Sequence, residues 1–422
     1  ITVYEGSDDT GAVVGKGILH ITPRDFAKQL TTMKAVHAPS KLAGLKALAR
    51  FGALFAGDLV STYANVLAPS HVLHPHAEPR KRRSLRAPIP DVHSFLTEDG
   101  VALRLTRYQG GTKGPVMLAP GFGNKAEVYA LDTTSTNFVE YLVANDYDVW
   151  LFDRRSSPAL PSAAHPYSID DVATYDWPAA VAEVLRLTRA DDVQVVAHCM
   201  GSMTLLMAKI LGLEGVRNAV CSQVTTYFET NTMNRLKARF HIAEGLSALG
   251  IESVTTKVTP TWSDAILDKA LALYPIPKGE SCDNPVCHRI FGMFGPVYRH
   301  AQLNRATHRE MDQIFGVANT AVLHHLLAIL GKGHIIDKDG KDVYMPHIGR
   351  LTFPIHFIAG AQNEIAFPST SQRLYEELSE LNGPERYSRK QYEEYAHLDC
   401  FAGKDAATDI FPDLITELDR YN

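Results

Sequence analysis

A cysteine occupies the centre of a short pattern that is typical of enzymes whose nucleophile stands on a sharp turn. Residues 197–201 read Ala-His-Cys-Met-Gly, and they complete the apolar run 193–197. A strained turn between a strand and a helix needs small residues two positions on either side of the nucleophile, and Ala197 and Gly201 meet that need. Cys199 is therefore the candidate nucleophile, and it would attack as a thiolate. An inert, buried cysteine on the same turn is the alternative interpretation.

Candidates for the other catalytic groups follow Cys199 in the order expected for such a site, which is nucleophile, acid and then histidine. Asn363 and Glu364 are adjacent in the loop where an expected strand, residues 353–359, ends. His397 lies near the end of the chain, after a strand-like segment and before a helix. We expect His397 to act as the general base. Asn363 would orient its ring, as in Cys-His-Asn sites, and Glu364 is the competing orienting residue.

Backbone amides around the same turn are candidates for an oxyanion hole. The N–H groups of Met200 and Phe122 would donate to the developing oxyanion, Phe122 from the loop 120–123 that follows an earlier strand. A helix beginning at Ser202 would place its positive end near Cys199 and favour the thiolate. His397 would then generate that thiolate or hold it as an ion pair.

Alternating strands and helices are the elements that must position these residues. Strands are expected at 101–108, 115–119, 147–152, 193–197, 219–224, 353–359 and 387–392. Helices are expected at 138–144, 176–188, 202–211, 369–381 and 405–418. Repeated strand–helix units with apolar strands indicate an α/β fold with a mostly parallel, doubly wound sheet.

Three parts are expected along the 422 residues. Residues 1–91 form an N-terminal extension, which ends in a linker with the basic run 74–86. Because charge runs are usually solvated, we expect this linker to be exposed. Residues 92–224 and 351–422 form the α/β core. Residues 225–350 interrupt the alternation and predict a helical cap over the active site, and their aromatic and aliphatic content suggests a hydrophobic substrate.

Composition argues against several other functions. A net charge of −5 gives no reason to expect nucleic-acid binding. No apolar run is long enough to span a bilayer. No Gly-x-Gly-x-x-Gly motif opens a strand–helix–strand unit, so no flavin or other cofactor is expected. The first residue, Ile1, indicates a processed form or a piece of a longer protein. No compartment follows from the sequence, although the cytoplasm is favoured for a chain of this composition.

The chain holds five cysteines: Cys199, Cys221, Cys282, Cys287 and Cys400. This number is odd and too small for a disulfide scaffold. Cys282 and Cys287 are close enough to form a disulfide or to remain two thiols in a loop. A zinc site made of these two and His288 is weakly indicated, because no second pair stands at ligand spacing. No metal is therefore expected.

From about residue 92 onward the chain resembles the acid lipases, the lysosomal and gastric branch of the α/β-hydrolases. The similarity covers residues 138–152 (FVEYLVANDYDVWLF), 171–180 (DVATYDWPAA), the turn around Cys199, residues 354–368 and His397-Leu398-Asp399. This resemblance implies an α/β-hydrolase fold with a cap and an activity on esters. Residues 1–70 loosely resemble the segment that joins flavin-dependent glucose–methanol–choline oxidoreductases to hydrolase domains in bacterial fusion proteins. That second resemblance implies an oxidoreductase domain or partner on the N-terminal side.

The chain departs from the acid-lipase pattern at its catalytic positions. Cys199 stands where that family has serine, and Asn363 stands where it has aspartate. Pro120-Gly121 replaces the usual His-Gly ahead of the first helix. A thiol is intrinsically more acidic than an alcohol, so it needs less help from a buried carboxylate. The cysteine and the asparagine therefore fit together as one altered site.

Three functions are carried forward from the sequence. The first is a cysteine-dependent hydrolase of a hydrophobic ester, lactone or thioester, acting through a covalent thioester. The second is a cysteine acyltransferase or polymerase with the same triad, since polyhydroxyalkanoate synthases also place cysteine on this turn. The third is a non-catalytic hydrolase-fold module that serves an oxidoreductase.

Overall fold

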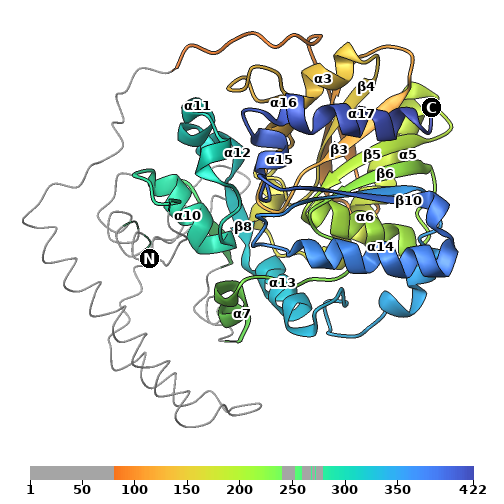
Figure 1. Cartoon of the computed structure of the whole chain (residues 1–422). Helices are drawn as coiled ribbons and strands as arrows, with labels where there is room; N and C mark the ends of the chain where they lie inside the picture. The colour runs from red at the N-terminus through yellow and green to blue at the C-terminus, as the bar shows by residue number, and fades with distance from the viewer. Residues whose placement is uncertain (1–79, 240–251, 259–267, 269–270, 272–278) are drawn as a thin grey trace, which may run out of the picture. The chain divides into compact units, whose positions relative to one another are not determined.

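The computed structural model describes residues 80–239, 252–258, 268, 271 and 279–422 (Figure 1). A central sheet carries the strands in the order β1-β2-β4-β3-β5-β6-β9-β10. Their bounds are β1 Asp91–Leu96, β2 Ala102–Tyr108, β3 Pro115–Ala119, β4 Asp148–Asp153, β5 Val193–His198, β6 Val216–Ser222, β9 Ile355–Gly360 and β10 Tyr387–Tyr392. The pairs β1–β2 and β2–β4 are antiparallel, and all other neighbours in this sheet are parallel. The prediction of a mostly parallel α/β sheet is confirmed.

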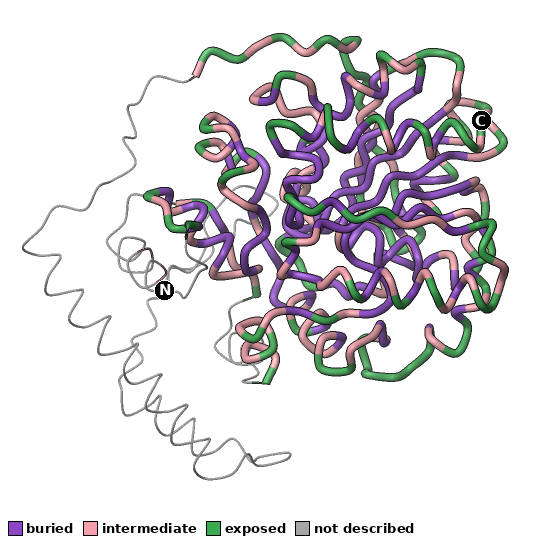
Figure 2. The backbone as a smooth tube through the Cα atoms, in the orientation of Figure 1, coloured by how far each residue is buried: buried purple, intermediate pink, exposed green. Residues whose placement is uncertain are grey.

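Helices cover both faces of this sheet, and each face has its own apolar core (Figures 1 and 2). One face carries α5 (Trp177–Thr188), α6 (Met200–Ile210) and α14 (Pro368–Asn382), and the other carries α3 (Phe138–Ala144) and α17 (Phe411–Asp419). Strands β3, β4, β5 and β9 are buried along their whole length. Continuous apolar strands of this kind are what a doubly covered sheet requires.

Several element boundaries differ from those expected. The helix after the nucleophile begins at Met200 rather than Ser202, so Cys199 itself is its N-cap. The closing helix expected at 405–418 is two helices, α16 (Ala406–Asp409) and α17, and Pro412 lies in the first turn of the second. Proline lacks the N–H that would continue the first helix into the second. Strand β1 was not expected from the sequence at all.

The described part of the basic linker, residues 80–86, is bound to the core rather than fully solvated. Arg83 Nη1 lies 2.6 Å from Oε1 of Glu140, whose side chain is only 2% exposed. Arg80 Nε lies 2.7 Å from Oε1 of Glu310, and Arg80 Nη2 lies 2.7 Å from Oδ1 of Asp132. The expectation of solvated charges is therefore wrong for these arginines, because their partners lie far away in the sequence.

Residues between β6 and β9 add no described strand to the central sheet. Their short strands β7 (Ser253–Thr255) and β8 (Val317–Asn319) pair only with each other. The α-helices described in this stretch are α7 Thr232–Arg239, α10 Pro285–Phe294, α11 Arg305–Arg309, α12 Met311–Ile314 and α13 Thr320–Lys332. They gather at one end of the sheet in Figure 1. We use the name cap for residues 225–350.

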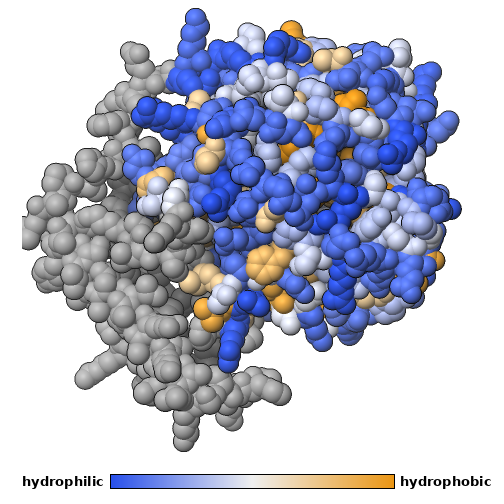
Figure 3. Space-filling model, viewed as in Figure 1, coloured by the Kyte–Doolittle hydropathy of each residue, from blue (hydrophilic) through white to orange (hydrophobic). Residues whose placement is uncertain are grey.

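The surface visible in Figure 3 is mostly hydrophilic over the described residues, with small separate apolar spots. Within the part of the chain that the structure covers, no helix has the length and apolar character of a membrane span. The N-terminal resemblance to an oxidoreductase linker falls on residues 1–70, which lie outside the described residues.

Candidate active site

Cys199 lies on the turn between β5 and α6 in a strained backbone conformation. Its φ is 55° and its ψ is −124°, a region that residues with a side chain rarely adopt. A Cβ atom added at Gly201 would lie 2.6 Å from the Ala119 carbonyl oxygen and 2.8 Å from that of Pro120. The glycine is therefore required, because the turn packs directly against the end of β3. Cys199 as a whole residue is half-buried at the end of the sheet.

The backbone N–H groups of Met200 and Phe122 are close enough to the Cys199 side chain to lower the pKa of its thiol. These are the two residues expected to form the oxyanion hole. Met200 contributes the first amide of α6, and Phe122 contributes an amide of the loop after β3. Gly121 lies beside them, and a Cβ atom there would be 3.1 Å from Cys199 Cβ. Donors in this position can stabilise negative charge that develops on a carbonyl oxygen of a bound substrate.

A buried arginine, which was not singled out from the sequence, forms hydrogen bonds to the loop that carries the Phe122 amide. Arg154 is 1% exposed, and its Nη2 donates to the carbonyls of Pro120 and Gly121. Its Nη1 donates to Thr204 Oγ1 at 3.3 Å. Burial lowers the pKa of Arg154, while nearby groups that include Asp176 and Cys199 raise it. The guanidinium thus fixes the Phe122 amide and places positive charge near the candidate nucleophile.

The side chains of His397 and Asn363 meet beneath this turn. His397 Nδ1 lies 3.2 Å from Asn363 Oδ1, and both residues are buried. The same Oδ1 accepts the backbone N–H groups of Ile365 at 2.9 Å and Ala366 at 3.1 Å. Backbone N–H groups can only donate, so the oxygen of the amide must face them and the histidine. His397 Nδ1 therefore carries the proton, and its Nε2 keeps a lone pair.

Gln223 holds the other end of the Asn363 amide. Asn363 Nδ2 donates to Gln223 Oε1 at 2.9 Å, and the backbone N–H of Gly360 donates to the same oxygen at 3.0 Å. Gln223 Nε2 in turn donates to Cys400 Sγ at 2.9 Å. Gln223 follows β6 and has a φ of 75°, but no local motif marks it in the sequence. Because both ends of its side-chain amide are held by these hydrogen bonds, Asn363 can adopt only one orientation.

Glu364 faces away from the histidine. Its Oε2 accepts from Asn231 Nδ2 at 3.4 Å, and its backbone carbonyl accepts from Asn231 N at 3.1 Å and Thr230 Oγ1 at 2.9 Å. The structure therefore brings Asn363, and not Glu364, to His397.

Burial shifts the pKa values of the Cys199 thiol and the His397 imidazole, the candidate nucleophile and base. Burial lowers the pKa of His397 to about 3. Burial also raises the pKa of Cys199, and the amides of Met200 and Phe122 together with the Arg154 charge only partly offset it. These pKa shifts favour a thiol and a neutral imidazole at rest, so of the two expected roles His397 would generate the thiolate rather than hold it as an ion pair. The helix does lower the pKa of Cys199 through its first amide, but desolvation is the larger effect.

Two further residues shape the histidine loop. The His198 ring lies edge-on to the His397 ring with centroids 4.7 Å apart, and burial holds the pKa of His198 well below its ordinary value. Asp399 Oδ1 accepts the Ala396 N–H at 2.8 Å, and its Oδ2 accepts the Arg299 N–H at 3.0 Å. Burial raises the pKa of Asp399 to about 7. Asp399 thus organises the loop and ties it to the cap.

An apolar pocket opens onto Cys199 and His397. The cap supplies much of its wall, including Phe294, Leu323 and Leu326. A pocket with this lining suits an apolar small molecule. Lys237 also lines it, and burial lowers the pKa of that amine to about 7.

Asn124 is a polar residue of the pocket wall that the sequence analysis missed. It is 5% exposed, and its Nδ2 makes no hydrogen bond within the structure. Its Oδ1 lies 3.5 Å from the position that a Cβ atom would take on Gly121. A buried donor without a partner costs free energy unless a ligand or water satisfies it. Asn124 is thus a candidate donor to bound substrate.

Comparison with known proteins gives a family and several relatives. Residues 116–354, more than half of the chain, match the model described as "Alpha/beta hydrolase family". Lipase member K of Mus musculus is 21% identical over 368 residues, which cover 78% of this chain and 87% of that protein. The tear acid lipase-like protein of Mesocricetus auratus is 23% identical over 361 residues, with the same coverage of 78% and 87%.

A solved structure agrees in fold. The soluble variant of monoglyceride lipase from Saccharomyces cerevisiae, in complex with a substrate analog, superposes with a TM-score of 0.50 at 15% identity. The superposition covers 82% of this chain and 98% of that one. At this identity the likeness concerns the arrangement of strands and helices alone.

Proposed function

We propose that this chain, which belongs to the α/β-hydrolase family, cleaves hydrophobic acyl compounds through a covalent thioester on Cys199. The chain is a hydrolase of the esterase and lipase kind. The cysteine mechanism is our inference, and one observation carries it. Cys199 stands on the strained turn, the nearby amides of Met200 and Phe122 lower the pKa of its thiol, and the pocket that it faces also contains His397.

Acylation begins with the neutral pair. As Cys199 Sγ attacks the substrate carbonyl carbon, its proton passes to His397 Nε2, the ring nitrogen with the lone pair. The oxyanion of the tetrahedral intermediate accepts from the amides of Met200 and Phe122. Collapse breaks the bond to the substrate's alkoxide or thiolate, which takes the proton from His397 and departs as the alcohol or thiol. The acyl group remains on sulfur as a thioester.

Deacylation repeats these steps with water. His397 takes a proton from the water as its oxygen attacks the thioester carbonyl, and the same two amides hold the oxyanion. The C–S bond then breaks, the sulfur recovers the proton from His397, and the carboxylic acid leaves. Asn363 keeps the ring oriented throughout, but it contributes no negative charge to the imidazolium. The lower basicity of a thiolate leaving group, compared with an alkoxide, compensates for that missing charge.

Hydrophobic acyl groups are the substrate class that the pocket favours. Its lining is apolar apart from a few groups such as Asn124 and Lys237, and each buried CH₂ contributes about 0.8 kcal/mol. The relatives with lipase names support an ester of this kind. We therefore expect kcat/KM for simple acyl esters to rise with chain length until the pocket is full.

A second function remains open because the nucleophile is sulfur. A thioester reacts readily with amines and thiols, so the same site supports acyl transfer to an acceptor other than water. Product analysis separates these outcomes. Hydrolysis predicts free acid as the main product with added alcohol, amine or thiol, whereas transfer predicts the corresponding ester, amide or thioester.

The deciding experiment traps the intermediate. The full chain is mixed with a chromogenic ester, quenched in acid and digested, and the acylated peptide is identified by mass spectrometry. An acyl group on Cys199 that neutral hydroxylamine removes supports the proposal. Turnover with no acyl group on Cys199 would reject it.

A further inference from the structure

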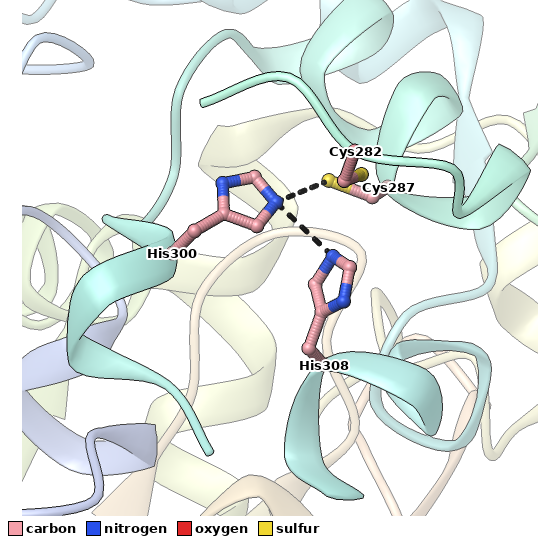
Figure 4. A group of neighbouring side chains, drawn as sticks. All are labelled: Cys282, Cys287, His300 and His308. Carbon is pink, nitrogen blue, oxygen red and sulfur yellow. Dashed lines mark hydrogen bonds between the residues drawn. The ribbon is translucent and has the colours of Figure 1, made fainter. Parts of the chain in front are cut away.

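Two thiols and two imidazoles of the cap converge on one point outside the active site (Figure 4). This group, the Cys₂His₂ cluster, consists of Cys282, Cys287, His300 and His308. The four candidate ligand atoms all lie within 4.8 Å of one another. They come from the loop before α10, from α10 itself, from the short 3₁₀ turn His300–Gln302 and from α11. Three separate elements therefore direct their side chains to the same place.

Distances within the Cys₂His₂ cluster suit a tetrahedral zinc ion. His300 Nε2 lies 3.4 Å from Cys287 Sγ and 3.1 Å from His308 Nε2. Zinc bonds of about 2.3 Å to sulfur and about 2.0 Å to nitrogen put tetrahedral ligand atoms roughly 3.5 Å and 3.3 Å apart. Two imidazole nitrogens at this separation need a shared proton or a cation between them. Little movement would be needed to accommodate the ion.

A buried carboxylate prepares His300 for metal binding. Glu280 Oε2 lies 2.6 Å from His300 Nδ1 and accepts the backbone N–H of His300 at 2.8 Å. An ionised carboxylate can only accept, so Nδ1 carries the proton and Nε2 presents its lone pair to the cluster. A carboxylate behind the far ring nitrogen is the usual support of a zinc-bound histidine. Arg299 Nε lies 3.0 Å from Glu280 Oε1, and this ion pair neutralises the charge of the carboxylate.

We propose that the Cys₂His₂ cluster binds one Zn²⁺ in a closed, structural site. Each thiol releases a proton on binding, so the ion and its two thiolates are together neutral. Four protein ligands complete the tetrahedron and leave no position for a reacting water.

Zinc in this place would hold the cap against the loop that carries His397. Arg299 precedes the ligand His300, and its backbone N–H binds Asp399. The Val297 carbonyl accepts from Leu398 N at 2.7 Å. The ion would thus fasten the segment that binds Leu398 and Asp399, the two residues that follow the candidate histidine. Its role is independent of whether Cys199 is the nucleophile.

The sequence analysis expected no metal because it found no second ligand pair. That pair is His300 and His308, whose wide spacing in the sequence conceals it. The histidine considered from the sequence, His288, is not one of the four ligands, and its Nε2 lies 2.8 Å from the Cys282 carbonyl oxygen. Cys282 and Cys287 are free thiols in the structure and do not form a disulfide.

Metal content tests the proposal directly. The full chain is produced with zinc in the medium, dialysed against metal-free buffer and measured by inductively coupled plasma mass spectrometry. We expect one zinc per chain, and at least a tenfold loss of zinc affinity in Cys282→Ser and His308→Gln. The matched controls Cys221→Ala and His347→Gln change the same residue types outside the cluster, and both should retain zinc. Substoichiometric zinc in the native chain, or full zinc in the ligand variants, would overturn the proposal.

Cobalt substitution keeps the test valid if a ligand variant fails to fold. The native chain is stripped with a chelator and loaded with Co²⁺, and its absorption is recorded. Thiolate-to-cobalt charge transfer with the intense d–d bands of a tetrahedral ion supports a site with cysteine ligands. A spectrum typical of octahedral cobalt overturns it. A Cys282–Cys287 disulfide, mapped in freshly isolated chain under non-reducing conditions, overturns it as well.

Discussion

The neutral Asn363 side chain determines which ring nitrogen of His397 carries the proton. Two backbone donors hold its oxygen, so the amide cannot rotate to offer its NH₂ group to the histidine. The imidazole is thereby oriented as an aspartate would orient it, but without a nearby negative charge. A serine nucleophile needs that charge, because its alkoxide is a far stronger base than a thiolate. The chemistry at Cys199 and the residue at 363 therefore constrain each other.

Substitutions at Cys199 test whether the proposed nucleophile and the residue at position 363 depend on each other. Cys199→Ala should lower kcat by roughly 10⁴-fold or more, since only binding and the oxyanion hole remain. Cys199→Ser should be nearly as poor, because Asn363 gives no charge to the imidazolium that a serine would require. Cys199→Ser combined with Asn363→Asp should recover part of the loss. Ester turnover is the measurement, and circular dichroism with Cys221→Ala controls for folding. A fully active Cys199→Ser variant would contradict this account.

The orienting residue can be identified from kinetics and pH dependence. Asn363→Ala should lower kcat/KM more than Glu364→Gln, because only Asn363 contacts His397. In the proposed mechanism the base is neutral His397, which is present above its pKa and lost as the pH falls through about 3. Asn363→Asp adds a negative charge that favours the imidazolium, so the acid limb of the pH–rate profile should move to higher pH. A crippled Glu364→Gln enzyme, or an unmoved acid limb in Asn363→Asp, would assign the orienting role elsewhere.

At the level of elements, the α/β alternation could be predicted because the inner strands are continuous apolar runs. The turn at Cys199 could be predicted too, since its small neighbours follow from steric contact with the end of β3. Asn124 and Gln223 could not, because each follows a strand without a motif and its role depends on contacts distant in sequence. The contacts of the basic linker could not be predicted for the same reason. Its partner Glu140 lies 57 residues beyond Arg83, and a charge run carries no local sign of a distant carboxylate.

The steric requirement at the nucleophile turn can be measured as stability. Gly201→Ala should lower the free energy of unfolding by about 2 kcal/mol or more, because the new Cβ would approach the Ala119 carbonyl to 2.6 Å. Gly331→Ala is the matched control. A Cβ atom at Gly331, within α13, meets nothing within 4 Å, so this change should be neutral or stabilise by up to about 1 kcal/mol. Urea unfolding compares the two, and equal effects would show that the turn tolerates a side chain.

For the whole molecule, long-range polar contacts join parts that the sheet does not connect. The loop of His397 binds the cap through Asp399 and Leu398, and the linker residue Arg80 binds Glu310 of the cap. Arg83 binds the N-terminal end of α3 through Glu140. These contacts hold the linker, the core and the cap around the pocket, whereas each apolar core belongs to one face of the sheet. Cap position, and with it the pocket wall, thus depends on these polar contacts together with cap residues that pack into both apolar cores, such as Val322 and Phe291.

The contribution of the Arg83–Glu140 ion pair to stability can be measured by changing the pH. Burial alone would raise the pKa of Glu140, but the bonds from Arg83 and from the backbone amides of Arg86 and Asn137 lower it to about 2. The stabilisation is therefore complete above the ordinary glutamate pKa of about 4.3 and is lost as the pH falls through about 2. Arg83→Ala should cost about 2 kcal/mol at about pH 7, because it leaves a buried carboxylate short of a partner.

The loss in Arg83→Ala should shrink as the pH falls below about 4, since protonation of Glu140 removes the charge that needs the arginine. Arg82→Ala is the matched control, because Arg82 is exposed and neighbours the same segment, and it should change stability by less than about 0.5 kcal/mol at either pH. Urea unfolding of both variants and the native chain at about pH 7 and about pH 3 measures these differences. Equal losses for the two arginines, or a loss in Arg83→Ala that does not depend on pH, would show that the linker is solvated after all. The expected pattern would instead make the buried carboxylate of α3 the anchor by which the linker reaches the core.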